Sequence, residues 1–242
     1  MKLALAHTRM ATLQLVRYPS FSVPTVLFPT IFFLFFAAGR VSGPEAGVYV
    51  ASFVGFGILG VAFFQFGVGI AIERTSPWEL YLRTLPLPLG ARFGARVLSA
   101  LLFASAASVL VAIVALVTTP VALSPARWLL LGAAALLASI PFGLLGIALG
   151  YWISPRGALP LANLLYLSLS FAGGLWTGRA LPDFVAEISP YLPTRHFAEV
   201  LWSAAAGTPW PHDAFPILGL YALVFGALAW IGYRRDEGEK FG

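Results

Sequence analysis

The chain has 242 residues, of which 59% are hydrophobic and only 10% are charged, and its formal net charge is +5. A soluble domain carries roughly 25% charged residues, and a chain of this size has too little interior to bury so much apolar sequence. Six apolar runs without charged residues are long enough to cross a bilayer as helices, so the sequence predicts one all-α integral membrane domain over residues 1–242. The predicted spans are 21–39, 48–72, 97–119, 128–153, 158–176 and 215–233.

The segment before the first predicted span, residues 2–18, carries Lys2, Arg9 and Arg17 around a broken apolar pattern. A cleaved signal peptide has one uninterrupted apolar core, so none is predicted here. The sequence contains no cysteine, which excludes a disulfide framework and a thiolate metal site.

A charged, proline-rich interval, ERTSPWELYLRTLPLPLGARFGAR, separates the second and third predicted spans at residues 73–96. Ser76, Pro77 and Glu79 fit a capping box with proline in the first turn, and the prolines at 86 and 88 end the helix, which predicts a helix over 77–85. A helix this short is marginal in water and needs a surface to lean on. Spacing alone leaves the bilayer and a protein partner equally open. Its apolar face holds Trp78, Leu82 and Leu85, and Glu79 and Arg83 form an i,i+4 pair.

Two amides lie inside predicted spans, Gln65 in the second and Asn163 in the fifth, at similar depth from the same end. They could line a shared cavity with the nearby aromatic residues Phe56, Phe64 and Tyr166. The alternative is that each amide bonds a neighbouring helix, which is the usual role of polar residues in membranes.

Two pairs of glycines four residues apart suit close helix packing, and they are candidates for a seam between two copies of the chain. These pairs are Gly146 with Gly150, and Gly174 with Gly178. After the fifth span, residues 181–207 predict two short helices, with Thr194 as the cap of the second and Gly207 as its end.

Six spans place both termini on one side of the membrane, and that side holds 11 of the 15 basic residues. The positive-inside rule therefore places both termini and the interval 73–96 in the cytoplasm. The basic residues are spread over four short segments, which argues against a nucleic-acid site. The four basic residues on the other side are Arg40, Arg127, Arg179 and Arg195.

The interval 73–96 resembles the first cytoplasmic loop of ATP-binding-cassette (ABC) exporters with type-2 permeases. That loop runs as Glu-Arg, a short gap, Leu-Glu-x-Leu, then Thr-Pro or Leu-Pro, then Gly-Lys. Ser76-Pro77 stands here where the family often has Gly-Thr, and Arg96 where it usually has Lys. The matching residues are Glu73-Arg74, Trp78-Glu79-Leu80, Thr84-Leu85-Pro86 and Gly94-Ala95-Arg96.

The resemblance implies that 77–85 is the coupling helix that docks on an ATPase subunit, through Ser76, Trp78, Glu79, Leu82, Arg83 and Leu85. Residues 2–18 resemble the family's elbow helix on the cytoplasmic face. Residues 181–207 resemble its re-entrant helices at the outer leaflet, on a match carried by Pro182, Pro190, Pro193, Phe197 and Glu199.

The resemblance further implies the membrane subunit of an exporter in the cell membrane, which moves a hydrophobic or amphiphilic, drug-like or lipid-like substrate. Two such chains, identical or related, would pair above two ATPase subunits. ATP and Mg²⁺ would bind to those ATPases, because this chain has no GxxxxGK[ST] sequence. No cofactor, catalytic residue or metal ligand is predicted on this chain.

Two other function classes remain, a stand-alone secondary carrier or membrane scaffold, and an intramembrane enzyme. No predicted span holds a charged residue, which argues against an ion-coupled carrier. The three histidines, His7, His196 and His212, lie outside the spans, and neither HExxH nor GxSxG occurs, which argues against the enzyme.

Overall fold

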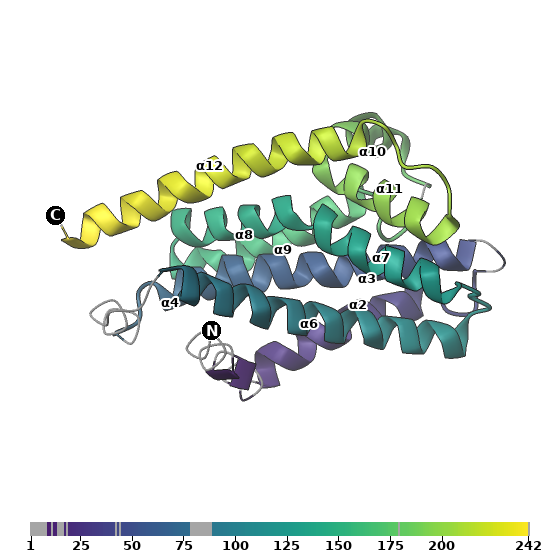
Figure 1. Cartoon of the computed structure of the whole chain (residues 1–242), viewed down its shortest axis with the longest axis horizontal. Coiled ribbons are helices and arrows are strands. Elements are labelled where there is room, and N and C mark those ends of the chain that lie inside the picture. Colours follow the sequence, from purple (N-terminus) through teal and green to yellow (C-terminus); the bar gives the residue numbers. More distant parts are fainter. Residues whose placement is uncertain are drawn as a thin grey trace.

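The computed structural model describes residues 9–10, 12–13, 17, 19–41, 43, 45–77, 89–178 and 180–241, and these residues form helices and no strand. Most of the helices run side by side in one bundle (Figure 1). Their bounds are α2 Pro19–Phe36, α3 Glu45–Val61, the π-helix η1 Ala62–Val68, α4 Gly69–Glu73, α6 Leu89–Thr118, α7 Pro125–Ala138, α8 Ile140–Trp152, α9 Pro155–Ala172, α10 Asp183–Ile188, the 3₁₀-helix η2 Ser189–Tyr191, α11 Pro193–Ala206 and α12 Ala214–Phe241.

Each of the six predicted spans is helical over most of its length, but the helices differ in how well they suit a membrane. Within the described part of the chain, four are long and apolar enough to cross one: Glu45–Glu73, Gly94–Thr118, Pro125–Trp152 and Ala214–Gly238. A fifth, Ser22–Phe36, is apolar but shorter. The described part of the chain thus has helices as its regular secondary structure and four candidate membrane-crossing helices, and the count of six stays a prediction.

Serine and proline determine where several helices begin or break. Ser124 and Ser154 each accept a hydrogen bond from the backbone N–H three residues on, and each precedes a proline at the first helical position. The predicted fourth span is broken at Ser139, two residues before Pro141, into α7 and α8.

The predicted cap at Thr194 is wrong, because α11 begins at Pro193 without a side-chain cap. The predicted end at Gly207 is confirmed: this residue is left-handed, with φ 71°. The predicted sixth span ends at residue 233, but α12 continues to Phe241, because the charged residues that follow are good helix formers.

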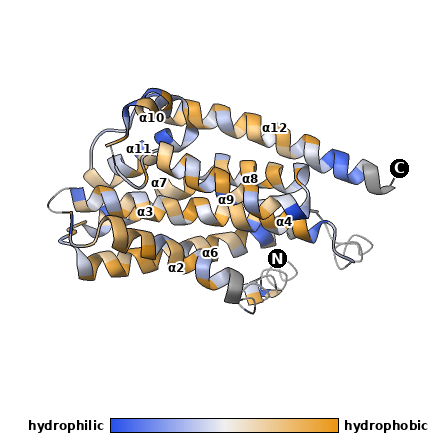
Figure 2. Ribbon diagram, turned by 180° about the vertical axis from the view of Figure 1, so that it is seen from behind, coloured by the Kyte–Doolittle hydropathy of each residue, from blue (hydrophilic) through white to orange (hydrophobic). Residues whose placement is uncertain are grey.

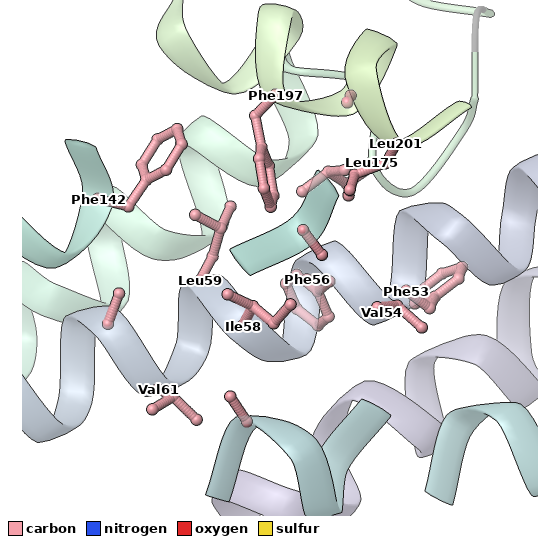
Figure 3. Close-up of a cluster of buried hydrophobic side chains, with 14 of the residues drawn as sticks. Phe53, Val54, Phe56, Ile58, Leu59, Val61, Phe142, Leu175, Phe197 and Leu201 are labelled. Atoms are coloured by element: carbon pink, nitrogen blue, oxygen red, sulfur yellow. The ribbon is translucent and has the colours of Figure 1, made fainter. Parts of the chain in front are cut away.

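The core of the bundle is one continuous rod made of α3, η1 and α4, which we call the central rod. In its most apolar stretch 83% of the residues are buried. Figure 3 shows Phe56 and Leu59 of this rod beneath Phe197 and Leu201 of α11, with Phe142 of α8 beside them. The helix α11 is buried along most of its length and packs on α3, α7 and α12.

The glycines of α8 bring that helix against the central rod. A Cβ added at Gly146 would lie 2.3 Å from the carbonyl oxygen of Ala62, and one at Gly150 would lie 2.6 Å from Ile70 Cβ. The predicted role of this pair in a seam between two copies is therefore wrong. Gly174 and Gly178 are also not a helical seam, since both have positive φ in the turns after α9.

The two ends of the bundle differ from its middle in polarity. The end of α4, the turn between α8 and α9, and the C-terminal end of α12 share one end, while α10 and α11 lie at the other (Figure 1). Hydrophilic residues gather near both ends, and the long middles of the helices are hydrophobic (Figure 2). This pattern is what a bilayer requires of a protein that crosses it.

Candidate functional site

The base of the charged interval is held by two ion pairs, and each pair includes at least one residue that carries the family resemblance. Glu73, at the end of α4, pairs with Arg96 of α6, so the two stems of the interval are joined. Arg74 pairs with Asp236 of α12 at 2.8 Å between Arg74 Nη1 and Asp236 Oδ1. Arg74 also donates to the carbonyl oxygen of Ile153, at 3.2 Å, where α8 ends. We call the set Arg74, Ile153 and Asp236 the Arg74 junction.

The helix α12 approaches α8 closely next to this junction because position 232 is glycine. A Cβ at Gly232 would lie 2.7 Å from Nε1 of Trp152. That indole N–H donates to the carbonyl oxygen of Leu228 at 2.9 Å, and the guanidinium of Arg235 lies 5.7 Å from the centre of the Trp152 ring. The polar contacts therefore fix the C-terminal end of α12 against α8.

Most of the predicted coupling helix lies outside the described residues, namely Trp78, Glu79, Leu82, Arg83 and Leu85. Ser76 is described, and its backbone N–H donates to the carbonyl oxygen of Glu73 at 2.9 Å. Pro77 is helical. The Ser-Pro start that caps α7 and α9 thus recurs here, and the docking role of the helix stays a prediction.

Three of the five predicted cavity residues meet inside the membrane part of the bundle. The rings of Phe56 and Tyr166 stack with centroids 4.5 Å apart and planes at 12°. The Tyr166 hydroxyl donates to the carbonyl oxygen of Phe56 at 3.1 Å, and Phe64 meets the Tyr166 ring edge-on at 5.5 Å. This cluster joins the central rod to α9.

The two predicted amides behave differently from the aromatic residues. Gln65 lies in η1 with 5% of its surface exposed, and its Nε2 has no hydrogen-bond partner among the described residues. Asn163 is half-buried on α9, and the described residues show no hydrogen bond between the two amides. The described residues therefore show no hydrogen bond from Gln65 Nε2 to a neighbouring helix, which the alternative role of this amide requires. Burial of an amide donor without a partner is costly.

Aromatic residues of α2, which the sequence reasoning missed, extend the cluster. The ring of Phe56 lies 5.3 Å from Phe32, which lies 5.3 Å from Trp176. Trp176 in turn lies 6.0 Å from Phe36, again between centroids. We call this run the aromatic row, and it connects the rings of Phe64, Tyr166, Phe56, Phe32, Trp176 and Phe36.

The aromatic row runs from η1 to the far end of α2. Phe56 and Tyr166 are buried, Phe32 and Trp176 are partly buried, and Phe36 is 38% exposed. The Trp176 indole N–H is buried with no partner in the described part of the chain. A sequence signal for the row existed, because Phe28, Phe32 and Phe36 recur at intervals of four residues on one helix face.

A separate apolar cavity of about 250 Å³ lies between η1, α6 and the α7–α8 break. It is lined by Phe66, Ala100, Ala104, Gly143 and Ile147 among others, and by none of the five predicted residues. Three of the five predicted lining residues thus belong to a packed aromatic row, and the role of all five in a substrate cavity stays a prediction.

No family model matches the sequence. The chain is 24% identical over 230 residues to "Putative transport permease YvfS" of Bacillus subtilis (strain 168), and the match covers 93% of this chain and 94% of that protein. The similarity thus spans nearly the whole of both chains. Together with the long apolar helices, it supports a multi-pass membrane protein that serves in transport rather than in catalysis.

Proposed function

We propose that the chain is the membrane subunit of an ABC exporter with type-2 permeases. In this proposal all six apolar helices cross the cell membrane, both termini are cytoplasmic, and two such chains pair above two ATPase subunits. The ATPases bind ATP and Mg²⁺, and their closure moves the interval 73–96 of each permease.

The observation that carries the proposal is the way in which the interval 73–96 is attached. It lies between two apolar helices, and Glu73, Arg74 and Arg96 hold its base with ion pairs. A loop that only connected two helices would need no such attachment, whereas a loop that receives force from a partner would. The likeness to a transport permease along the whole chain supports the same function.

The substrate that suits the aromatic row is hydrophobic or amphiphilic. The row offers ring faces, the indole N–H of Trp176 and the nearby amide of Gln65, and it contains no charged side chain. Aromatic faces bind apolar molecules and organic cations. An inorganic ion would usually require ionisable groups within the membrane.

The test is to purify the tagged chain from its native membrane and to identify what copurifies. A protein with a P-loop should be recovered with it, and the complex should hydrolyse ATP, whereas the chain alone should not. Recovery of no P-loop protein, together with transport by the chain alone in vesicles, would favour the stand-alone carrier. ATP hydrolysis by the isolated chain would also contradict the proposal.

A further inference from the structure

Asp236 is an unusual residue on a mostly exposed helix. Only 17% of the most apolar stretch of α12 is buried, yet Asp236, near its end, has 3% of its side chain exposed. A buried carboxylate needs a partner, because desolvation penalises its charge. Arg74, from a segment 162 residues away in the sequence, is such a partner.

Arg74 connects three segments at the residue where the central rod ends. It stands directly after α4, its guanidinium binds Asp236 of α12, and a second nitrogen donates to the carbonyl oxygen of Ile153 between α8 and α9. Guanidinium suits this task because its donors point in fixed, separate directions. Arg74 therefore holds the end of the central rod, the α8–α9 turn and α12 in one geometry.

We propose that the Arg74–Asp236 pair is a positioning contact that makes the root of the interval 73–96 and the C-terminal end of α12 move as one body. A push on that interval then reaches α12 and the α8–α9 turn together with the central rod. The transmission of movement through this contact rests on the proposed function, because an ATPase would supply the push. The rigid connection between the two segments does not depend on the proposed function.

Three features of the structure favour a rigid connection over a chance surface pair. Asp236 is buried, and Arg74 has only 17% of its side chain exposed, so solvent screens the pair little. Gly232, one turn earlier on α12, lets that helix approach Trp152. The Trp152 indole N–H then binds the Leu228 carbonyl oxygen, so α12 is held against α8 on the turns before Asp236.

The test measures the distance between the two ends that the pair connects. The chain has no cysteine, so Thr75→Cys and Gly238→Cys give two unique sites for spin labels, and both positions are exposed. Double electron–electron resonance, a pulsed electron paramagnetic resonance method, on the purified chain in lipid nanodiscs should give one narrow distribution of distances between the two labels. Asp236→Asn should broaden that distribution at least twofold, because it removes the negative charge that Arg74 binds on α12.

Rescue separates positioning from a general loss of structure. The exchange Arg74→Asp with Asp236→Arg restores the opposite charges and should narrow the distribution again. Arg74→Lys keeps the charge but has a single ammonium group, and should give an intermediate width. The matched control is Arg234→Gln, on the same turn, whose guanidinium lies 5.0 Å from the Trp230 ring centre. It should leave the distribution unchanged.

The inference is overturned if Asp236→Asn leaves the distance distribution as narrow as in the parent. If Asp236→Asn does not fold, Arg74→Lys takes its place, and an unchanged width in that variant overturns the inference. In the complex with its ATPase, ATP and vanadate should leave the distance between 75 and 238 unchanged in the parent, and should change it in Asp236→Asn. A change in the parent would also overturn it. If no ATPase copurifies but the widths follow the charges, the proposed function fails and the positioning contact stands.

Discussion

The most apolar stretches of the central rod and of α12 have the same mean hydropathy, yet they have opposite surroundings. The most apolar stretch of the rod is 83% buried inside the protein, and that of α12 is 17% buried. The rod has α6, α8, α9 and α11 around it, whereas α12 packs mainly on α8 and α11. Hydropathy therefore identifies a helix that avoids water, but it does not tell whether protein or lipid replaces the water.

Residue size along the two helices explains the difference. In the rod, glycines admit large neighbours: Gly55 faces Leu201 and Phe197, and Gly60 faces the Tyr166 ring. On α12 the exposed positions are bulky, such as Leu223 at 74% exposure. Small residues let helices approach within a membrane, and large apolar ones suit contact with lipid chains. The rod is thus built for protein contact on all sides, whereas α12 packs along α8 and α11 on one side and leaves its other side exposed.

We expect the C-terminal ends of the central rod and of α12 to share the cytoplasmic face. Cysteine labelling tests this orientation with an all-or-none result. Single cysteines at Thr208, before α12, and at Gly238, near its end, should differ completely in labelling by an impermeant maleimide on intact cells. Thr208→Cys should react, and Gly238→Cys should react only after the cells are opened. The reverse pattern would invert the predicted orientation.

The same truncation on the two helices should have very different costs. Leu59→Ala in the rod removes a fully buried side chain and should lower the free energy of unfolding by about 2–5 kcal/mol. Leu223→Ala on α12 should change it by less than about 0.5 kcal/mol, as surface substitutions do. Unfolding by heat or denaturant in detergent, followed by size-exclusion chromatography, measures both. Equal losses would mean that a partner protein covers α12.

Substitutions in the interval 73–96, which continues from the rod, should have the next largest effect, on binding of the ATPase. If 77–85 docks on an ATPase, Trp78→Ala should weaken the complex by about 2 kcal/mol, which is roughly 30-fold in affinity. Leu82→Asp should act similarly, and Arg83→Ala at the rim should cost less than about 1 kcal/mol. Recovery of the ATPase in a pull-down from detergent compares them. Unchanged recovery with both Trp78→Ala and Leu82→Asp would leave the bilayer surface as the support of this helix.

The smallest expected effects concern the amides. If Gln65 and Asn163 face substrate, replacing either with alanine should shift the half-maximal dye concentration for stimulated ATP hydrolysis about fivefold, near 1 kcal/mol. The assay uses the purified complex with a panel of neutral and cationic hydrophobic dyes. Ser168→Ala, at an exposed position of the same helix as Asn163, is the control. Parental responses from both amide variants, with normal assembly, would make the amides packing groups.

The sequence was sufficient for the helical class and for the approximate place of each long helix. Long uncharged runs leave a chain no other way to satisfy its backbone in lipid. The Ser-Pro starts of α7 and α9 also follow from local chemistry, since cap and proline act within four residues. Helix ends were less accessible, because an uncharged run marks only the membrane-crossing part of a helix, and α12 extends beyond that run to Phe241.

The site was only partly accessible to sequence reasoning. Glu73, Arg74 and Arg96 stood out as a motif, but their partners did not, because nothing local links Arg74 to Asp236 across 162 residues. The same limit applies to the glycines of α8. Their spacing predicted close approach correctly, but the approaching element is the carbonyl of Ala62 in the same chain. The spacing of small residues indicates that one face of a helix allows close packing, but it does not identify the element that packs there.

The length of α12 has a practical consequence for imaging. Its helix runs without a break from Ala214 to Phe241, and it ends beyond the rest of the bundle (Figure 1). A helical fusion protein joined in register after that point would inherit a defined direction relative to the membrane domain, because a continuous α-helix curves only gently unless a specific residue kinks it. Such a rigid extension would give electron microscopy a marker for particle alignment outside the detergent belt.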